Sequence, residues 1–155
     1  MTRFFPNLAA FSAFMPRVIV AEKFADIAGR EAIAITLARR VRERIGTPEK
    51  LPPPLAESTQ ERRVKMGYTA DRTLYASGVL HKSIGWEHVS LRKTVVASSD
   101  EKAVWHELGP SNNHFPRRSF LASTVAAEEA ELFEIFVKTF GLYFQIGRAS
   151  CRERV

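Results

Sequence analysis

The residues best suited to metal chemistry are His106 and the adjacent Glu107. A zinc-hydrolase helix carries two histidines one turn apart with a glutamate between them, in the pattern H-E-x-x-H. No second histidine stands at that spacing here, since the next one along the chain is His114. The sequence therefore predicts no metal site, and we interpret His106 as a partly buried polar residue beside Trp105.

The other candidates for catalytic chemistry are also incomplete. Ser77 and Ser83 lack the G-x-S-x-G turn that exposes a nucleophilic serine. The two nearby histidines, His81 and His88, fall on different predicted elements and cannot be assigned to either serine. The chain contains no P-loop and no G-x-G-x-x-G turn that would hold the phosphates of a nucleotide. We therefore expect a protein that is not an enzyme and that binds no cofactor.

A polar loop with aromatic and arginine side chains at its ends is the most informative stretch, and it lies within residues 103–121. Aromatic and arginine side chains are enriched among the residues that dominate binding at protein–protein interfaces. The sequence predicts an assembly surface made of Trp105, His106, Glu107, Phe115, Arg117, Arg118 and Phe120. In the alternative interpretation, Trp105 and Phe120 belong to the core and both arginines are solvated.

The composition is that of one ordinary globular domain. A chain of 155 residues, 45% hydrophobic and 26% charged, can bury one core. No run approaches the roughly 18 apolar residues that a membrane-spanning helix requires, so we expect no membrane partner. The net charge of +6 permits contact with DNA or with an acidic protein surface but requires neither.

The two ends of the chain differ from the rest. Residues 1–17 are expected to form an N-terminal arm rather than a signal peptide, because Phe4, Phe5 and Pro6 break the charged-then-apolar order. Residues 146–155 are the translation of ATC GGA AGA GCG TCG TGT AGG GAA AGA GTG, which resembles a sequencing adapter. We expect a non-native read-through tail there; the alternative is a genuine basic tail. Without the tail the net charge falls from +6 to +4 and the only cysteine, Cys151, is lost.

Helical periodicity dominates the first third of the chain. An apolar turn over residues 8–15 is expected to end at Pro16, and a long helix is expected over residues 18–45, ended by a left-handed Gly46. The predicted core stripe of the long helix is Val20, Phe24, Ile27, Ala34, Ala38, Val41 and Ile45. Further apolar residues widen this stripe, which is typical of a helix that also contacts a second subunit.

Short elements follow a proline-rich linker. Residues 58–61 read as a capping box that opens a short basic helix, and Ser77 is expected to cap another helical turn. A hairpin is predicted from residues 84–91, which alternate, and residues 94–97, which are mostly β-branched or apolar.

Two more helices complete the expected fold, a short one over residues 102–108 and a long one over residues 119–144. The predicted class is α+β, with two long helices packed on a small antiparallel sheet, short helices and a long central loop. We expect a single domain that spans residues 18–145.

Three sequence blocks stand in order after an L-A-E-S-T element at residues 55–59. The first block, residues 73–84, reads T-L-Y-A-S-G-V-L-H-K-S-I. The second is V-V-A-S at residues 95–98 followed by A-V-W-H-E-L-G at residues 103–109, and the third is F-P-R-R-S-F-L at residues 115–121. Together they resemble the conserved blocks of phage tail-completion and head–tail joining proteins, also called virion morphogenesis or minor tail proteins, of Mu-like and lambdoid phages. Arg118-Ser119 departs from the Arg-Pro of that family.

The resemblance implies an α+β subunit that assembles with copies of itself into a ring such as a hexamer. The ring would cap the phage tail tube and join it to the head connector, without catalytic residues. The protein would be located in the virion, and in the host cytoplasm during assembly. If the loop lines a DNA channel, Arg117 and Arg118 would contact phosphates.

A second interpretation is a small basic nucleic-acid-binding or toxin-like protein. It would use the arginines at residues 39–44 and the basic cluster at residues 62–65. This interpretation predicts that a free monomer binds DNA with a steep salt dependence. The ring predicts a high-mass species in size-exclusion chromatography.

Overall fold

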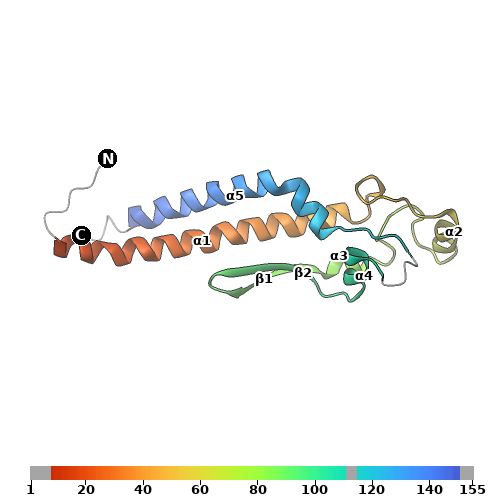
Figure 1. The fold of residues 1–155 in the computed structure, drawn as a ribbon, viewed down its shortest axis with the longest axis horizontal. Coiled ribbons are helices and arrows are strands. Elements are labelled where there is room, and N and C mark those ends of the chain that lie inside the picture. Colours follow the sequence, from red (N-terminus) through yellow and green to blue (C-terminus); the bar gives the residue numbers. More distant parts are fainter. Residues whose placement is uncertain (1–7, 111–114, 151–155) are drawn as a thin grey trace. The chain divides into compact units, whose positions relative to one another are not determined.

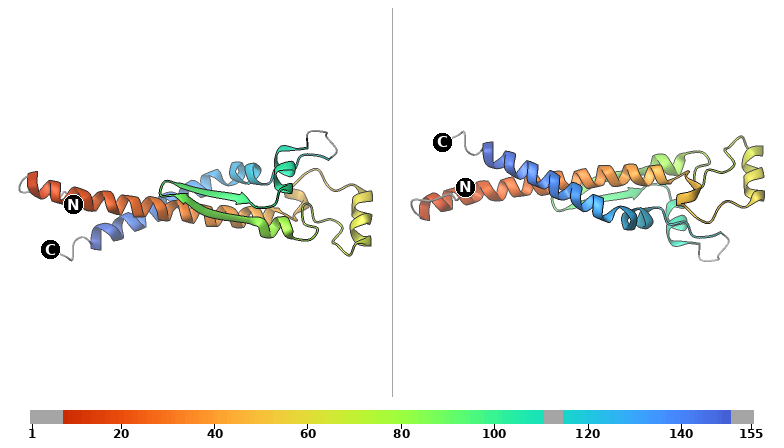
Figure 2. Two further views of the ribbon diagram at one scale, coloured as in Figure 1. Left: turned by 90° about the horizontal axis from the view of Figure 1, so that it is seen from below. Right: turned by 90° about the horizontal axis from the view of Figure 1, so that it is seen from above.

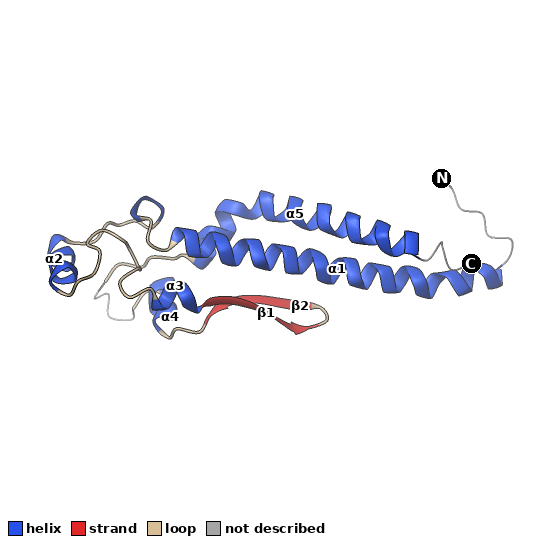
Figure 3. Cartoon of the chain, turned by 180° about the vertical axis from the view of Figure 1, so that it is seen from behind, coloured by secondary structure: helices blue, strands red, loops and turns tan. Residues whose placement is uncertain are grey.

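The computed structural model describes residues 8–110 and 115–150. Helices and strands follow one another along the chain as drawn in Figure 1. They are α1 (Leu8–Arg44), a 3₁₀ turn (Pro48–Lys50), α2 (Glu57–Lys65), α3 (Val79–Ser83), β1 (Ile84–Ser90), β2 (Lys93–Ser98), α4 (Lys102–Leu108) and α5 (Leu121–Ser150). The class is α+β, as predicted: two long helices and a two-stranded antiparallel sheet, coloured by type in Figure 3.

The chain forms two compact units. Unit 1 comprises residues 1–33 and 133–155, and unit 2 comprises residues 34–132. Each long helix contributes to both units, so the described part of unit 1 is a pair of helical segments. Unit 2 holds the ends of α1 and α5 that are nearer the middle of the sequence, together with every shorter element.

Helix α1 continues through Pro16, so the predicted break at that residue is wrong. A proline removes one backbone hydrogen bond from a helix, but the residues on either side keep theirs. Ala13, Met15 and Arg17 near Pro16 are good helix formers, and the helix continues through the proline. The predicted arm is therefore helical from Leu8 onward, and residues 1–7 of that arm lie outside the described residues.

The first half of α1 buries a different face from the predicted one. Val20 and Phe24 are 51% and 66% exposed, whereas Ala21 and Ala25 are buried. Gly29 continues this row of small residues, and a Cβ atom added there would lie 2.7 Å from Cδ2 of Phe136 in α5. The two segments of unit 1 approach so closely at this point that only a residue without a side chain fits.

On α5, aromatic rings at every fourth position form a row. The ring centroids of Phe136 and Phe140 are 5.8 Å apart, and those of Phe140 and Phe144 are also 5.8 Å apart. The rings are nearly parallel, with interplanar angles of 28° and 14°. Because Phe136 is held in this row, its ring cannot turn away from Gly29 without losing the stacking contact.

We expect Gly29→Ala to destabilise the chain by roughly 1–3 kcal/mol, as an overpacked contact does. The usual gain of about 1 kcal/mol for replacing glycine by alanine within a helix would be outweighed. Gly141→Ala is the matched control, because no atom lies within 4 Å of its added Cβ. Urea unfolding followed by circular dichroism measures both variants. An equal gain in stability at the two positions would contradict the close approach.

The core of unit 2 is built from six segments of the chain. Val41 and Ile45 from the end of α1 meet Leu51, Ile84 and Phe120, and the cluster is completed by Ala38, Leu80 and Ala103. Ala34, Ala38, Val41 and Ile45 are buried, which confirms the second half of the predicted stripe. Gly46 has a φ of 93° and donates its N–H to the carbonyl of Thr73, so the predicted left-handed end of α1 is confirmed.

The hairpin is confirmed close to its predicted bounds. Ile84 pairs with Ser98 and Trp86 with Val96, and the register shifts between His88 and Ser90. Figure 2 shows the two strands lying side by side as a two-stranded sheet. Trp86 and Val96 are partly buried against the core of unit 2. Arg42 of α1 donates a hydrogen bond to the carbonyl of Ile84, which ties the base of the hairpin to the helix.

Two predicted helix caps are wrong. Helix α2 begins at Glu57 after Ala56, without a side-chain cap, and Gln60 instead donates to the carbonyl of Leu55. Helix α3 is preceded by Gly78 with a φ of 77°, not by a capping Ser77. Both helices are short, and the prolines and glycines before them set the direction of the chain more strongly than a serine hydroxyl does.

The last two helices lie where the sequence predicted them, but only α4 has the predicted length. Helix α4 spans Lys102–Leu108 as predicted, whereas α5 begins at Leu121 and continues to Ser150, beyond the expected end at residue 144. The segment predicted to be a read-through tail is thus helical as far as Ser150, and residues 151–155 lie outside the described part. Among the described residues, no helix combines the length and the apolar character needed to cross a bilayer.

Candidate functional site

Helix α4 and the segment that returns along it carry the predicted assembly residues. The helix ends at Gly109, whose φ of 88° turns the chain and whose N–H donates to the carbonyl of Trp105. The returning segment is held against α4 by a 3.0 Å hydrogen bond from the N–H of Arg118 to the carbonyl of His106. Residues 111–114, including His114, lie outside the described residues.

Glu107 caps the start of α5 from the neighbouring helix. Its Oε1 accepts hydrogen bonds from the Ser119 hydroxyl at 2.6 Å and the Ala122 N–H at 2.9 Å. Its Oε2 accepts from the N–H groups of Phe120 and Leu121, both at 2.9 Å. The first N–H groups of a helix have no partner within the helix, and a negative charge suits the positive end of its dipole. Glu107 therefore supplies the partners that the sequence of α5 does not.

The pKa of Glu107 reflects this arrangement. Burial on its own raises the pKa of a carboxyl group, but the hydrogen bonds from Ser119, Ala122, Leu121 and Phe120 favour the charged form more strongly. The pKa of Glu107 therefore lies below the ordinary glutamate value of 4.5. Glu107 was predicted to lie on the assembly surface. In the structure its carboxylate instead bonds to the start of α5 within the same subunit.

Arg118 is a structural residue and not a surface contact. Its side chain is 7% exposed, and its Nε and Nη2 donate to the carbonyl of Pro53 at 3.0 and 2.9 Å. A further bond from Nη2 reaches the carbonyl of Pro54 at 3.2 Å. The prediction that Arg118 contacts DNA phosphates at the surface is therefore wrong, because the proline-rich linker covers it. Arg117 is exposed, and its Nε donates to the carbonyl of Glu107.

Phe120 is fully buried in the core of unit 2, so its predicted place on the assembly surface is wrong and the alternative interpretation holds for it. Trp105, in contrast, is 52% exposed. It forms an apolar patch on α4 with Val104 and Leu108, which are 57% and 70% exposed; we call these three residues the α4 patch. The sequence interpretation missed Val104 and Leu108, although their separation by one helical turn places them on one face.

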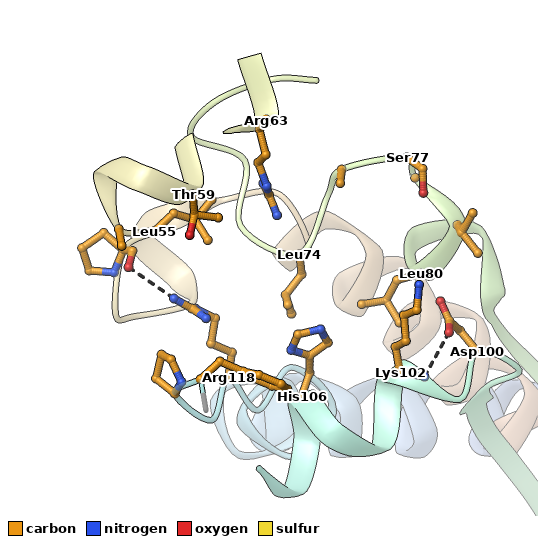
Figure 4. A pocket seen from close by; sticks show the side chains of 17 residues that line it. Leu55, Thr59, Arg63, Leu74, Ser77, Leu80, Asp100, Lys102, His106 and Arg118 are labelled. Carbon is orange, nitrogen blue, oxygen red and sulfur yellow. Dashed lines mark hydrogen bonds between the residues drawn. The ribbon is translucent and has the colours of Figure 1, made fainter. Parts of the chain in front are cut away.

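His106 and Phe115 face a pocket instead of the surface patch. Their ring centroids are 5.2 Å apart, and both line a pocket of about 540 Å³ that Figure 4 shows from close by. His106 is partly buried, as the sequence analysis expected. Arg63 of α2 and Lys102 of α4 line the same pocket. The sequence interpretation missed their connection, because no spacing relates residue 63 to residues 102–118.

The site differs from a metal centre in its side chains. Among them, no group of three or more His, Cys, Asp or Glu side chains is arranged to hold a metal ion. What the site does present is an exposed apolar patch on α4, a capped helix start and a cationic pocket beneath them. No protein-family model, no curated protein and no solved structure matches the chain.

Proposed function

We propose that the chain is a structural subunit that assembles with copies of itself at the head–tail junction of a phage particle. The observation that carries the self-assembly is the number of large apolar side chains that remain exposed on α1 and α5. Those in unit 1 are Leu8, Phe11, Met15, Ile19, Val20, Phe24, Phe133, Val137, Leu142, Tyr143 and Ile146.

The energy available from this surface favours association. Fully burying one such side chain contributes roughly 1.5–3 kcal/mol, whereas association costs about 4–15 kcal/mol in lost translational and rotational freedom. A contact that covers several of these side chains offsets that cost. In a ring every copy makes two such contacts by reusing one pair of surfaces.

The head–tail junction is proposed from the three sequence blocks. The blocks contribute α3, α4 and the returning segment, all within unit 2. Leu80 of the first block, His106 of the second and Arg118 of the third line one pocket. This joint packing supports treating the blocks as one motif and not as three separate chance matches. Arg117 remains the candidate contact to DNA in the channel of such a ring.

The nucleic-acid-binding alternative is less well supported, because the arginines at the end of α1 are used within unit 2. Arg39 pairs with Glu43 at 2.7 Å, and Arg40 pairs with Glu131 at 2.9 Å. Arg44 donates to the hydroxyl of Ser123. A DNA backbone would have to displace these partners before it could bind the run.

Native mass tests the self-assembly. We expect the full chain to form a species of several copies in light scattering coupled to size exclusion, well above the 17.5 kDa of one chain. Phe24→Ser and Phe133→Ser, each at a position 66% exposed, should shift this species to single-chain mass without loss of helix content. Arg62→Ser, an exposed change in the basic cluster of α2, is the control and should leave the mass unchanged.

Two outcomes would count against this proposal. One is single-chain mass for the unsubstituted protein at every concentration tested. The other is an assembly that survives both phenylalanine substitutions but disappears with Arg62→Ser. Trp105→Ser separately tests whether the α4 patch contributes to the same contact.

A further inference from the structure

The pocket beside α4 collects positive charge from three separate segments. Arg63 comes from α2, Lys102 from α4 and Arg118 from the returning segment, and all three line the same space. In Figure 4 the guanidinium of Arg63 and the imidazole of His106 point into the pocket from opposite walls. All these residues belong to unit 2, so the pocket lies within one compact body.

This charge is not neutralised by the part of the chain that the structure describes. Among the residues that the structure describes, Asp100 is the only carboxylate that lines the pocket, and its Oδ1 accepts a hydrogen bond from the backbone N–H of Lys102 at 3.0 Å. Within the described ranges, none of the three cations forms an ion pair with a carboxylate. The charge of Arg63 lowers the pKa of Arg118, after the larger effect of burial, so two like charges act on the same pocket. Like charges held together without a counter-charge attract an anion.

One buried imidazole nitrogen beside the pocket also lacks a partner in the described chain. Nδ1 of His106 is shielded from solvent and has no hydrogen-bond partner within residues 8–110 and 115–150. A buried polar atom without a partner costs roughly 1–3 kcal/mol unless something else bonds to it. Burial lowers the pKa of His106, the charges of Arg118 and Lys102 lower it further, and Asp100 acts in the opposite direction. A neutral imidazole with its proton on Nδ1 would be a hydrogen-bond donor.

Apolar side chains also line the pocket. They include Leu55, Leu74, Leu80 and the ring of Phe115. A volume of about 540 Å³ lies within the range of pockets that hold small organic molecules. In Figure 4, Leu74 lies between Arg63 and His106, and Leu80 lies beside Lys102. Such a lining fits a small molecule that carries both a charged group and an apolar group of a few carbon atoms.

We propose that this pocket binds a small organic oxyanion, a carboxylate or phosphate group carried on a compact apolar body. Arg63 and Lys102 attract the oxyanion, and the imidazole of His106 lines the space that it occupies. Leu74, Leu80 and Phe115 hold the body. Arg118 adds its charge while its Nε and Nη2 remain bonded to the linker. The inference does not depend on the proposed assembly, because every residue it uses lies within unit 2 of a single chain.

Phenyl phosphate, benzoate, inorganic phosphate and benzyl alcohol are the probes for a calorimetric titration of the full chain. We expect one molecule of phenyl phosphate or benzoate to bind per chain, at least tenfold more tightly than inorganic phosphate or benzyl alcohol. The C2 proton of His106 provides a second readout by NMR. Its pKa should rise on binding, because a bound anion favours the charged imidazole.

Arg63→Gln and Lys102→Gln should each weaken binding of phenyl phosphate by roughly tenfold, the usual effect of losing one charge-assisted contact. Lys102 is exposed and its ammonium bonds to nothing in the described chain, so Lys102→Gln should fold even if Arg63→Gln disturbs the bond to Arg72. Lys65→Gln on α2 is the matched control, because Lys65 does not line the pocket.

The proposal would be overturned by the absence of saturable binding of both phenyl phosphate and benzoate. An equal weakening in Lys65→Gln would overturn it as well, because the effect would then come from net charge alone. A His106 resonance that does not respond to a saturating probe would place the bound anion elsewhere and exclude the pocket.

Discussion

Replacing Glu107 with alanine is expected to lower the free energy of unfolding by roughly 2–4 kcal/mol. The substitution removes the acceptor for the N–H groups of Phe120, Leu121 and Ala122 and for the hydroxyl of Ser119. These donors lie at the start of α5, partly shielded from water, and nothing else in the first turn of α5 replaces the carboxylate. Urea unfolding of the two proteins measures the difference. Glu129→Gln, an exposed change on α5, is the control and should have little effect.

The effect of Glu107 should depend on pH in a defined direction. Its folded-state pKa is lower than the ordinary value of 4.5, so the charged carboxylate stabilises the fold fully above that value. This contribution is lost as the pH falls through the folded-state pKa. The stability difference between the wild type and Glu107→Gln should therefore be largest near neutral pH and should shrink below about pH 4.5. A difference that grows on acidification would show that the carboxylate does not act as the cap.

Replacing Phe120 with alanine is expected to cost roughly 3–5 kcal/mol, the usual range for deleting a buried aromatic ring. Phe120 is 0% exposed and belongs to the same cluster as Val41, Ile45 and Ile84. The cavity would open where α1, the hairpin and the start of α5 meet, and all three would lose contacts. Thermal and urea unfolding of the full chain measure the loss.

Phe133→Ala is the matched control for this substitution, since Phe133 on the same helix is 66% exposed. The comparison is made at a concentration low enough for single chains, because Phe133 is also on the proposed assembly surface. A cost below 1 kcal/mol for Phe120→Ala would mean that this ring is not part of a tightly packed core. If the expected cost is measured, any loss of assembly in Phe120→Ala follows from instability, because the buried ring cannot contact another copy.

The parts of the fold predicted correctly are those set by local chemistry. The bounds of α4 follow from turn-forming residues at Ser99 and Asp100 and from Gly109 at its end. The hairpin follows from an alternating strand and a β-branched strand separated by a short turn. The end of α1 is signalled by Gly46 itself, although its N–H also bonds to the distant carbonyl of Thr73. In each case the signal and the structure lie within about ten residues of each other.

The buried face at the start of α1 was predicted one position out of register, and the reason is physical. Periodicity gives weight to large apolar residues such as Val20 and Phe24, which are exposed. The face that packs on α5 is chosen by size instead, because Ala21, Ala25 and Gly29 allow the helices to approach closely. No property of α1 taken alone reveals that choice, since it depends on the ring of Phe136 more than a hundred residues away.

The roles of the site residues also depend on partners that are distant in the sequence. Aromatic and arginine residues are common both at interfaces and in cores, so their types alone could not separate Trp105, which is exposed, from Phe120, which is buried. The role of Arg118 depends on the carbonyl of Pro53, which is 65 positions distant in the sequence. The role of Glu107 depends on a helix that begins fourteen residues later. Only the folded chain brings these partners together.

Two adjacent residues of α4 have separate roles. His106 lines the pocket, and Glu107 accepts hydrogen bonds from the first turn of α5. Helix α4 has seven residues, so one short element supplies both a wall of the cavity and the anchor for the start of a helix of thirty residues. A substitution that distorts α4 should therefore disturb the cavity and the start of α5 together.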